Sequence, residues 1–168
     1  MSGKVSHDSE TPAHGQQVFT AGAFIHRDFS GTTKIFLPRR SLIKKFFPGV
    51  YEMPGGHIDF GEDMVDGLKR EVKEELDMTI SVGDPFFVFT YHNEIKGSHS
   101  IEESYFAKFI EPIDQIKIDP GDHLEFGWYS MTEVANIMKI GRPVSEDLEL
   151  QAIKKGFEIL SGKQLNFG

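Results

Sequence analysis

The strongest constraint on the fold of this chain is the stretch of residues 51–80, YEMPGGHIDFGEDMVDGLKREVKEELDMTI. It opens with Pro54-Gly55-Gly56, a turn signal, and continues into a segment whose apolar residues recur at helical spacing. At about 100° per residue, four of them fall on one narrow stripe: Val65, Leu68, Val72 and Leu76. The segment is therefore predicted to be an amphipathic helix that buries this stripe in the core.

The same helix gathers carboxylates on another face. Glu71, Glu74 and Glu75 stand at positions i, i+3 and i+4, where side chains are neighbours, and Arg70 and Lys73 offset their repulsion only in part. Mg²⁺ commonly takes one or two carboxylates together with water and substrate phosphate. The cluster predicts a metal site for cleaving diphosphates, with a solvated acidic helix face as the alternative.

These residues resemble the Nudix box, G-x5-E-x7-R-E-U-x-E-E-x-G-U, in which U is a bulky apolar residue. The matching positions are Gly56, Glu62, Arg70, Glu71, Val72, Glu74, Glu75 and Met78. Asp77 stands where the box has Gly, at a helix end that often requires positive φ, which Asp tolerates better than most residues. We expect a modest loss of stability and little effect on activity. The resemblance covers residues 16–160.

The resemblance implies an α+β protein with the Nudix fold, a mixed β-sheet sandwiched between helices. It implies hydrolysis of a nucleoside diphosphate linked to another group, or of a nucleoside triphosphate, by metal-activated water. It assigns metal binding to Glu71, Glu74 and Glu75 with the Gly55 carbonyl, and a secondary or water-mediated role to Glu62. Arg70 would orient the glutamates through charge-assisted hydrogen bonds. The expected cofactor is Mg²⁺, with Mn²⁺ as an alternative.

The general base is left open among Glu74, Glu75 and Glu125, which precedes Trp128 on a late strand. His57 directly follows the glycine pair and is a candidate for a phosphate contact. The alternative for Glu125 is an exposed charge at a strand edge.

Other candidate ligand contacts lie outside the box. Arg39 and Arg40 match phosphate oxygens in geometry, with plain surface charge as the alternative. Phe46 and Phe47 are candidates for stacking on a base or for buried packing. The remaining histidines are interpreted as surface or packed residues: His7, His14, His92, His99 and His123.

The rest of the chain predicts one domain. Residues 1–15 are polar and lack periodicity, so a flexible tail is expected there, and residues 16–168 form the domain. Residues 28–33 are expected to form the turn of a hairpin, 38–40 to end the second strand, 41–50 to form a loop and 112–122 a long connection. The predicted strands are 17–26, 34–37, 85–93, 100–110 and 123–130, and further helices are predicted at 131–138 and 145–160.

Composition excludes several classes of protein. The chain has 39% hydrophobic and 26% charged residues and no apolar run long enough to span a membrane. No secretory signal is recognisable at the N-terminus, so a cytoplasmic protein is expected. The net charge of −8 disfavours binding of a nucleic-acid polymer but not of a small nucleotide bridged by metal.

The absence of cysteine removes disulfides, thiolate catalysis and Cys-based zinc sites. It also disfavours isoprenoid diphosphate isomerisation, which depends on a Cys in proteins of a related fold. The alternative function is a Nudix domain that senses nucleotides without cleaving them. A homodimer is compatible with the resemblance, and the substrate is not specified by the sequence.

Overall fold

The computed structural model describes residues 10–142 and 147–162. A six-stranded sheet with the order β4-β5-β1-β2-β6 forms its centre, and β3 pairs with β1 beside β2. The strands are β1 (Gln17–Phe29), β2 (Thr32–Arg40), β3 (Gly55–His57), β4 (Ile80–Asn93), β5 (Ser98–Phe109) and β6 (His123–Ser130). The helices are α1 (Met64–Leu76), α2 (Met131–Ile137) and α3 (Leu148–Leu160), with a short 3₁₀ turn η1 (Ile113–Gln115).

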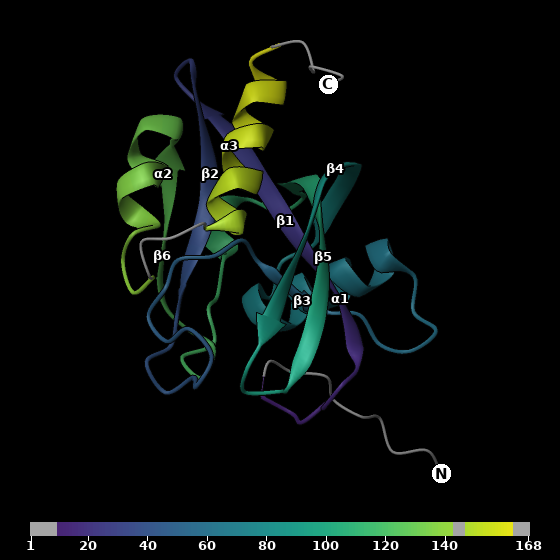
Figure 1. Cartoon of the computed structure of the whole chain (residues 1–168). Helices are drawn as coiled ribbons and strands as arrows, with labels where there is room; N and C mark the ends of the chain where they lie inside the picture. Colours follow the sequence, from purple (N-terminus) through teal and green to yellow (C-terminus); the bar gives the residue numbers. More distant parts are fainter. Residues whose placement is uncertain (1–9, 143–146, 163–168) are drawn as a thin grey trace.

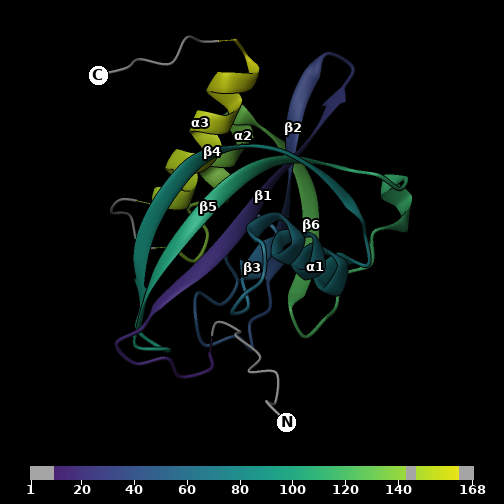
Figure 2. The ribbon, with the colours of Figure 1, turned by 90° about the vertical axis from the view of Figure 1, so that its right-hand side faces the viewer.

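Helices cover both faces of this sheet. Figures 1 and 2 show α1 on one face and α2 and α3 on the other. Strand β1 pairs in parallel with β5 and antiparallel with β2 and β3, so the sheet is mixed. The predicted α+β fold, a mixed sheet between helices, is confirmed.

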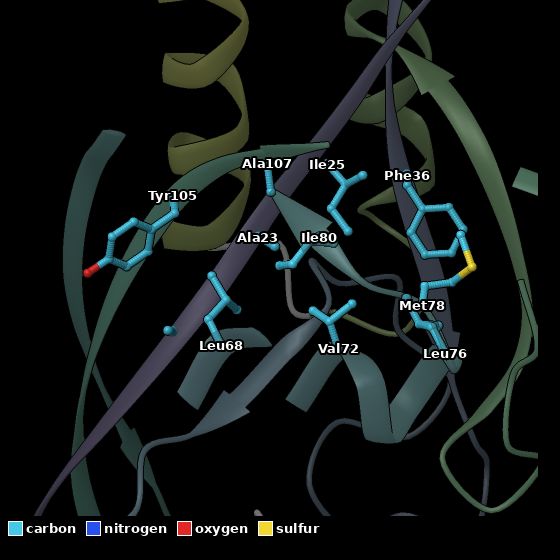
Figure 3. Close-up of a cluster of buried hydrophobic side chains, with 11 residues drawn as sticks. Ala23, Ile25, Phe36, Leu68, Val72, Leu76, Met78, Ile80, Tyr105 and Ala107 are labelled. Carbon is cyan, nitrogen blue, oxygen red and sulfur yellow. The ribbon is translucent and has the colours of Figure 1, made fainter. Parts of the chain in front are cut away.

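The core under α1 consists of the predicted stripe and the facing strand residues. Leu68, Val72 and Leu76 are fully buried against Ala23 and Phe36 (Figure 3). Burying each of these large side chains stabilises the fold by roughly 1.5–3 kcal/mol. Val65, the remaining residue of the stripe, packs against the cluster but is only half-buried.

The second core lies under α2 and α3. Phe24 alternates with Ala23 along β1 and packs edge-on against Phe157 of α3, at 5.1 Å between ring centroids. Because both faces of the sheet are covered, β1 is apolar on both sides, which explains its continuous run of buried residues.

The first hairpin is tighter than the predicted turn over residues 28–33. Ser30 and Gly31 take φ of 51° and 89°, so two residues suffice for the turn. Asp28 and Phe29 therefore continue β1 and pair with β2.

Two expectations about strand ends are wrong. Pro38 does not end the second strand: β2 continues to Arg40, because its missing N–H lies on the edge away from β6 and the β2–β6 ladder runs on past it. Strand β4 begins at Ile80, not residue 85, because its ladder with β5 shifts register around Pro85 instead of breaking.

The remaining elements lie close to the bounds predicted from the sequence. Helix α2 begins after Ser130, which forms a capping box with Glu133. The last helix begins after Asp147, its N-cap, and the start predicted at residue 145 lies outside the described residues. Ala13 and Gly15 hydrogen-bond to the carbonyls of residues 96 and 97, so this part of the expected tail lies against the β4–β5 turn. No helix in the described ranges is long and apolar enough to cross a membrane.

Candidate active site

The site is built where β3 lies between β1 and α1. Gly55 has a φ of 147°, and a Cβ on it would lie 2.0 Å from the carbonyl oxygen of Ala21. A Cβ on Gly56 would lie 2.6 Å from Oε2 of Glu71. The two glycines are therefore required for close approach, one of backbone to β1 and the other of a carboxylate to the backbone.

Helix α1 is fixed at both ends. Asp63 is the N-cap, and its Oδ1 accepts the N–H groups of Val65 and Asp66 at 2.9 and 3.1 Å. Asp77, the departure from the box, is the C-cap with a φ of 53° and forms an ion pair with Lys73 at 2.8 Å. The predicted positive φ at this position is confirmed, as is its place outside the carboxylate group.

Arg70 lies at the centre of the carboxylates. Its Nε and Nη2 donate to the two oxygens of Glu62 at 2.8 and 2.9 Å, a bidentate pair. Its Nη1 donates to Glu71 at 2.9 Å and to Glu74 at 3.3 Å. Its Nη2 also donates to the carbonyl of His57 at 2.9 Å. We call Arg70, Glu62, Glu71 and Glu74 the Arg70 cluster.

The negative charge around Arg70 is only partly balanced. Burial raises the pKa of Glu71 to about 7, although Arg70 opposes this change. Burial, with Glu52 and Glu71 nearby, raises the pKa of Glu75 well above its ordinary value, and the Gly55 N–H, 3.5 Å from Oε2, opposes the rise. Such carboxylates favour either a proton or an additional cation.

The donor set fits a hard divalent cation. Carboxylate oxygens of Glu71, Glu74 and Glu75 project from one helix beside the half-buried β3 backbone of Gly55 and Gly56. In the described parts of the chain, no three His, Asp or Glu side chains are already arranged to hold a metal ion. The reason is visible in the contacts: Arg70 draws Glu71 and Glu74 toward itself, while Glu75 turns to Gly55.

Glu125 lies on the opposite face of the sheet from α1. Its neighbours Phe126 and Trp128 pack on Phe36 of the α1 core, so alternation along β6 directs Glu125 to the other side. There it accepts hydrogen bonds from the Tyr51 hydroxyl at 2.7 Å and from Arg39 at 3.3 Å, which lower its pKa. The structure thus brings Glu125 together with Arg39 and Tyr51 and does not bring it into the Arg70 cluster.

The two candidate phosphate-binding arginines are occupied within the protein. Arg39 Nε donates to the Gly49 carbonyl at 2.9 Å, and Arg40 Nε donates to the Phe46 carbonyl at 3.0 Å. Both therefore hold the loop of residues 41–50. Arg40 also pairs with Glu52 at 3.4 Å.

The other ring-bearing candidates fall in different places. His57 is buried on β3, and alternation with Gly56 turns its side chain away from Glu71. Phe46 packs against Phe47 at 4.6 Å and lies nearly parallel to Tyr91, with 6.1 Å between ring centroids. His123 is buried with its Nε2 3.3 Å from Glu52. The pair His92 and His99 stack on each other, and His7 lies outside the described residues.

Sequence reasoning missed a second group of charges around Arg142. This guanidinium forms ion pairs with Asp147 at 3.0 Å and Glu149 at 2.6 Å and also donates to the Tyr51 carbonyl at 2.8 Å. Glu149 in turn accepts the Met53 N–H at 2.7 Å. No local motif marks these residues, because the partners lie 91 and 96 positions apart. We call Arg142, Asp147 and Glu149 the Arg142 cluster.

Known proteins share both the sequence pattern and the fold. The family model described as NUDIX domain matches residues 17–148. An uncharacterised Nudix hydrolase of Nostoc sp. (strain PCC 7120), all7351, is 30% identical over 122 residues, which cover 68% of this chain and 67% of that protein.

Solved structures with the same fold include an Ap4A hydrolase of C. elegans, with a TM-score of 0.70 and 23% identity over 86% of this chain and 98% of that one. They also include a MutT Nudix hydrolase of Burkholderia pseudomallei, with a TM-score of 0.65 and 22% identity over 83% and 98% of the two chains. At these identities the two structures show the fold alone. The family match over most of the chain agrees with the geometry of α1 and β3, and the protein belongs to the Nudix family.

Proposed function

We propose that this protein is a Mg²⁺-dependent hydrolase that cleaves the diphosphate linkage of a nucleoside diphosphate derivative or a nucleoside triphosphate. One observation carries the proposal: three glutamates surround a single arginine of α1, directly beside the two glycines of β3, which leave room for one of their carboxylates. Family membership supports hydrolase chemistry, and Mn²⁺ is the alternative ion.

The metal-binding residues in this proposal are Glu71, Glu74 and Glu75, with the Gly55 carbonyl, and Glu62 assists from outside. When bound, a divalent cation supplies Lewis acidity and lowers the pKa of bound water. Arg70 holds Glu62 through two hydrogen bonds and keeps Glu71 and Glu74 on one side of the helix. Gly56 leaves the space that the Glu71 carboxylate needs.

The general base in this proposal is a glutamate of α1. Glu125 faces away from α1 and already accepts two hydrogen bonds, so we assign this role to Glu74 or Glu75. The Glu74 side chain is 61% exposed, which gives it access to water. Oε2 of Glu75 lies 3.5 Å from the Gly55 N, beside the two glycines of β3.

The direct test is turnover of a panel of compounds with Mg²⁺. The panel contains diadenosine tetraphosphate, which the name of one structural neighbour suggests, together with nucleoside triphosphates, ADP-ribose and sugar nucleotides. Reaction in ¹⁸O-labelled water followed by mass spectrometry of the products identifies the phosphorus that is attacked. We expect turnover that EDTA abolishes and that Mg²⁺ restores.

Variants test the assigned residues. Glu74→Gln and Glu75→Gln should each lower turnover by about 10²–10³-fold, the typical effect of removing one preorganised electrostatic contact. Asp66→Asn is the matched control, because Asp66 lies on the same helix, is exposed and contributes only its backbone N–H to the cap. Tight binding of a panel compound without turnover would contradict hydrolysis and favour the nucleotide sensor.

A further inference from the structure

The segment of residues 50–54 leads directly into β3 and its two glycines, and it is held by β2 on one edge. The Arg40 N–H donates to the Val50 carbonyl at 2.8 Å, and the Glu52 N–H donates to the Pro38 carbonyl at 3.1 Å. In an extended segment, successive backbone groups point to alternate edges. The Tyr51 carbonyl and the Met53 N–H therefore point to the edge that β2 does not cover.

The Arg142 cluster occupies that edge in place of a strand. Arg142 Nη2 donates to the Tyr51 carbonyl at 2.8 Å, and Oε1 of Glu149 accepts the Met53 N–H at 2.7 Å. The other oxygen of Glu149 accepts from Arg142 Nη2 at 2.6 Å, so one ion pair supplies both the donor and the acceptor. Asp147 adds a third contact at 3.0 Å and also caps α3 by accepting the Leu150 N–H.

These contacts are strong because they are charged and enclosed. The side chains of Arg142, Asp147 and Glu149 are only 11%, 14% and 14% exposed. Hydrogen bonds to ionised groups are stronger than those between neutral groups. The segment they hold leads straight into the site: the Pro54 carbonyl accepts the Ala23 N–H at 2.8 Å, and the next N–H, that of Gly55, faces Glu75.

We propose that Arg142 and Glu149 are positioning residues for the hydrolytic site. They fix the backbone of residues 51–53 and thereby the placement of Gly55 and Gly56 relative to Glu71 and Glu75. The C-terminal helix α3 is thus a structural part of the site, although it lies across the sheet from α1. This role in turnover rests on the proposed hydrolase function, whereas its backbone effect does not.

The first test measures the backbone of the full chain without metal or substrate. In Glu149→Ala, hydrogen exchange of the Met53 amide should accelerate by about 10- to 100-fold, and the amide resonances of Gly55 and Gly56 should shift. Glu158→Ala is the control, since Glu158 lies on the same helix and its side chain makes no hydrogen bond or ion pair with the described residues. Unchanged Gly55 and Gly56 resonances in Glu149→Ala would overturn the proposal.

The second test separates positioning from substrate contact. On the best compound of the panel, Glu149→Ala should lower kcat by about 10-fold and leave KM within twofold, because the residue acts through the backbone. Glu149→Gln, which keeps an acceptor for the Met53 N–H, should restore the Met53 protection and part of kcat. A rise in KM with unchanged kcat would overturn the proposal, as would an equal loss of kcat in Glu158→Ala.

Two further outcomes are decided by the same measurements. If Glu149→Ala does not fold, Arg142→Lys is used in its place, because a single ammonium cannot reach Tyr51, Asp147 and Glu149 together. Shifted Gly55 and Gly56 resonances in that variant support the proposal, and unchanged resonances overturn it. If the wild-type protein hydrolyses nothing in the panel, the hydrolase function fails, and the exchange and resonance data alone judge the positioning role.

Discussion

Two arginines each bind several carboxylates, on opposite sides of the same sheet. They differ in how much negative charge is left without a partner. Arg70 satisfies Glu62 completely and shares Nη1 between Glu71 and Glu74, at a face that water reaches. Arg142 is enclosed, and its cluster binds backbone groups: Arg142 donates to the Tyr51 carbonyl, and Asp147 accepts the N–H of Leu150 in α3. The first arrangement can accept a cation, whereas the second holds the chain in place.

The surplus of negative charge has different consequences in the two clusters. Near Arg70, an added divalent cation can neutralise Glu71 and Glu75, whose pKa values burial raises. Near Arg142, burial together with Glu149 and Glu52 raises the pKa of Glu102 well above its ordinary value. A proton is then the simplest neutralising partner on the α3 side.

The largest expected effect is a loss of folding stability when the arginine of a cluster is replaced, and it should differ between the two clusters. Arg142→Met should cost about 3–5 kcal/mol, because it leaves buried carboxylates without their cation. Arg70→Met should cost less, since water screens a more exposed cluster. Urea denaturation of both variants measures this at unchanged m-value. Equal losses would show that the Arg142 cluster is not the structural one of the pair.

The next effect concerns the room that Gly56 leaves for Glu71. In Gly56→Ala the new Cβ would lie 2.6 Å from the Glu71 carboxylate, so this side chain must move. A displacement of about 1 Å in a catalytic group can lower kcat/KM by about 10²-fold. Gly83→Ala is the matched control, because its Cβ would meet ordinary contacts at 3.5 Å or more. Activity assays with the best panel compound compare the two, and similar rates would contradict the assigned role of Glu71.

These two clusters also show what the sequence can reveal. The Arg70 cluster lies within 13 residues, so helical periodicity and a known motif are enough to place its members together. The core stripe of α1 and the positive φ of Asp77 follow from the same local rules. The Arg142 cluster joins residues 51–53 to residues 142–149 through the fold, and no periodicity encodes such a distance.

The expectations about Pro38 and Glu125 also depend on contacts between residues distant in the sequence. Taken alone, Pro38 indicates a strand end, but β2 continues because its missing N–H faces away from the ladder with β6. The position of Glu125 before Trp128 suggests a place near the proposed metal site, yet strand alternation decides which face of the sheet it occupies. Partners across the sheet, not the residues themselves, determine these features.

A smaller effect tests the protonation of the α3 side. The pKa of Glu102 is raised in the folded chain by burial and by Glu149 and Glu52, while Arg142 opposes the rise. The stability gained from this proton is therefore present below about pH 4.5, the ordinary value, and is lost as pH rises through the folded pKa. A glutamine at this position stays neutral, so Glu102→Gln does not lose stability as pH rises. The Tm of this variant should exceed that of wild type by about 3 °C at pH 8 and by less at pH 5.

Thermal melts at the two pH values measure this difference. Glu94→Gln is the control, because Glu94 is exposed in the β4–β5 turn. A Tm difference between Glu102→Gln and wild type that does not change with pH would show that Glu102 is ionised in the folded protein.

The smallest effect concerns Asp77, where the chain departs from the Nudix box. A non-glycine residue at φ of 53° is strained, and Gly relieves that strain, but Asp77→Gly also removes the ion pair with Lys73. Because the ion pair is exposed, it contributes little, and we expect a net rise in Tm of about 2–4 °C. Activity should not change, since Asp77 lies outside the Arg70 cluster. If Asp77→Gly instead lowers both Tm and turnover, the Lys73–Asp77 pair must hold the end of α1 in register, and the last turn of this helix would belong to the site.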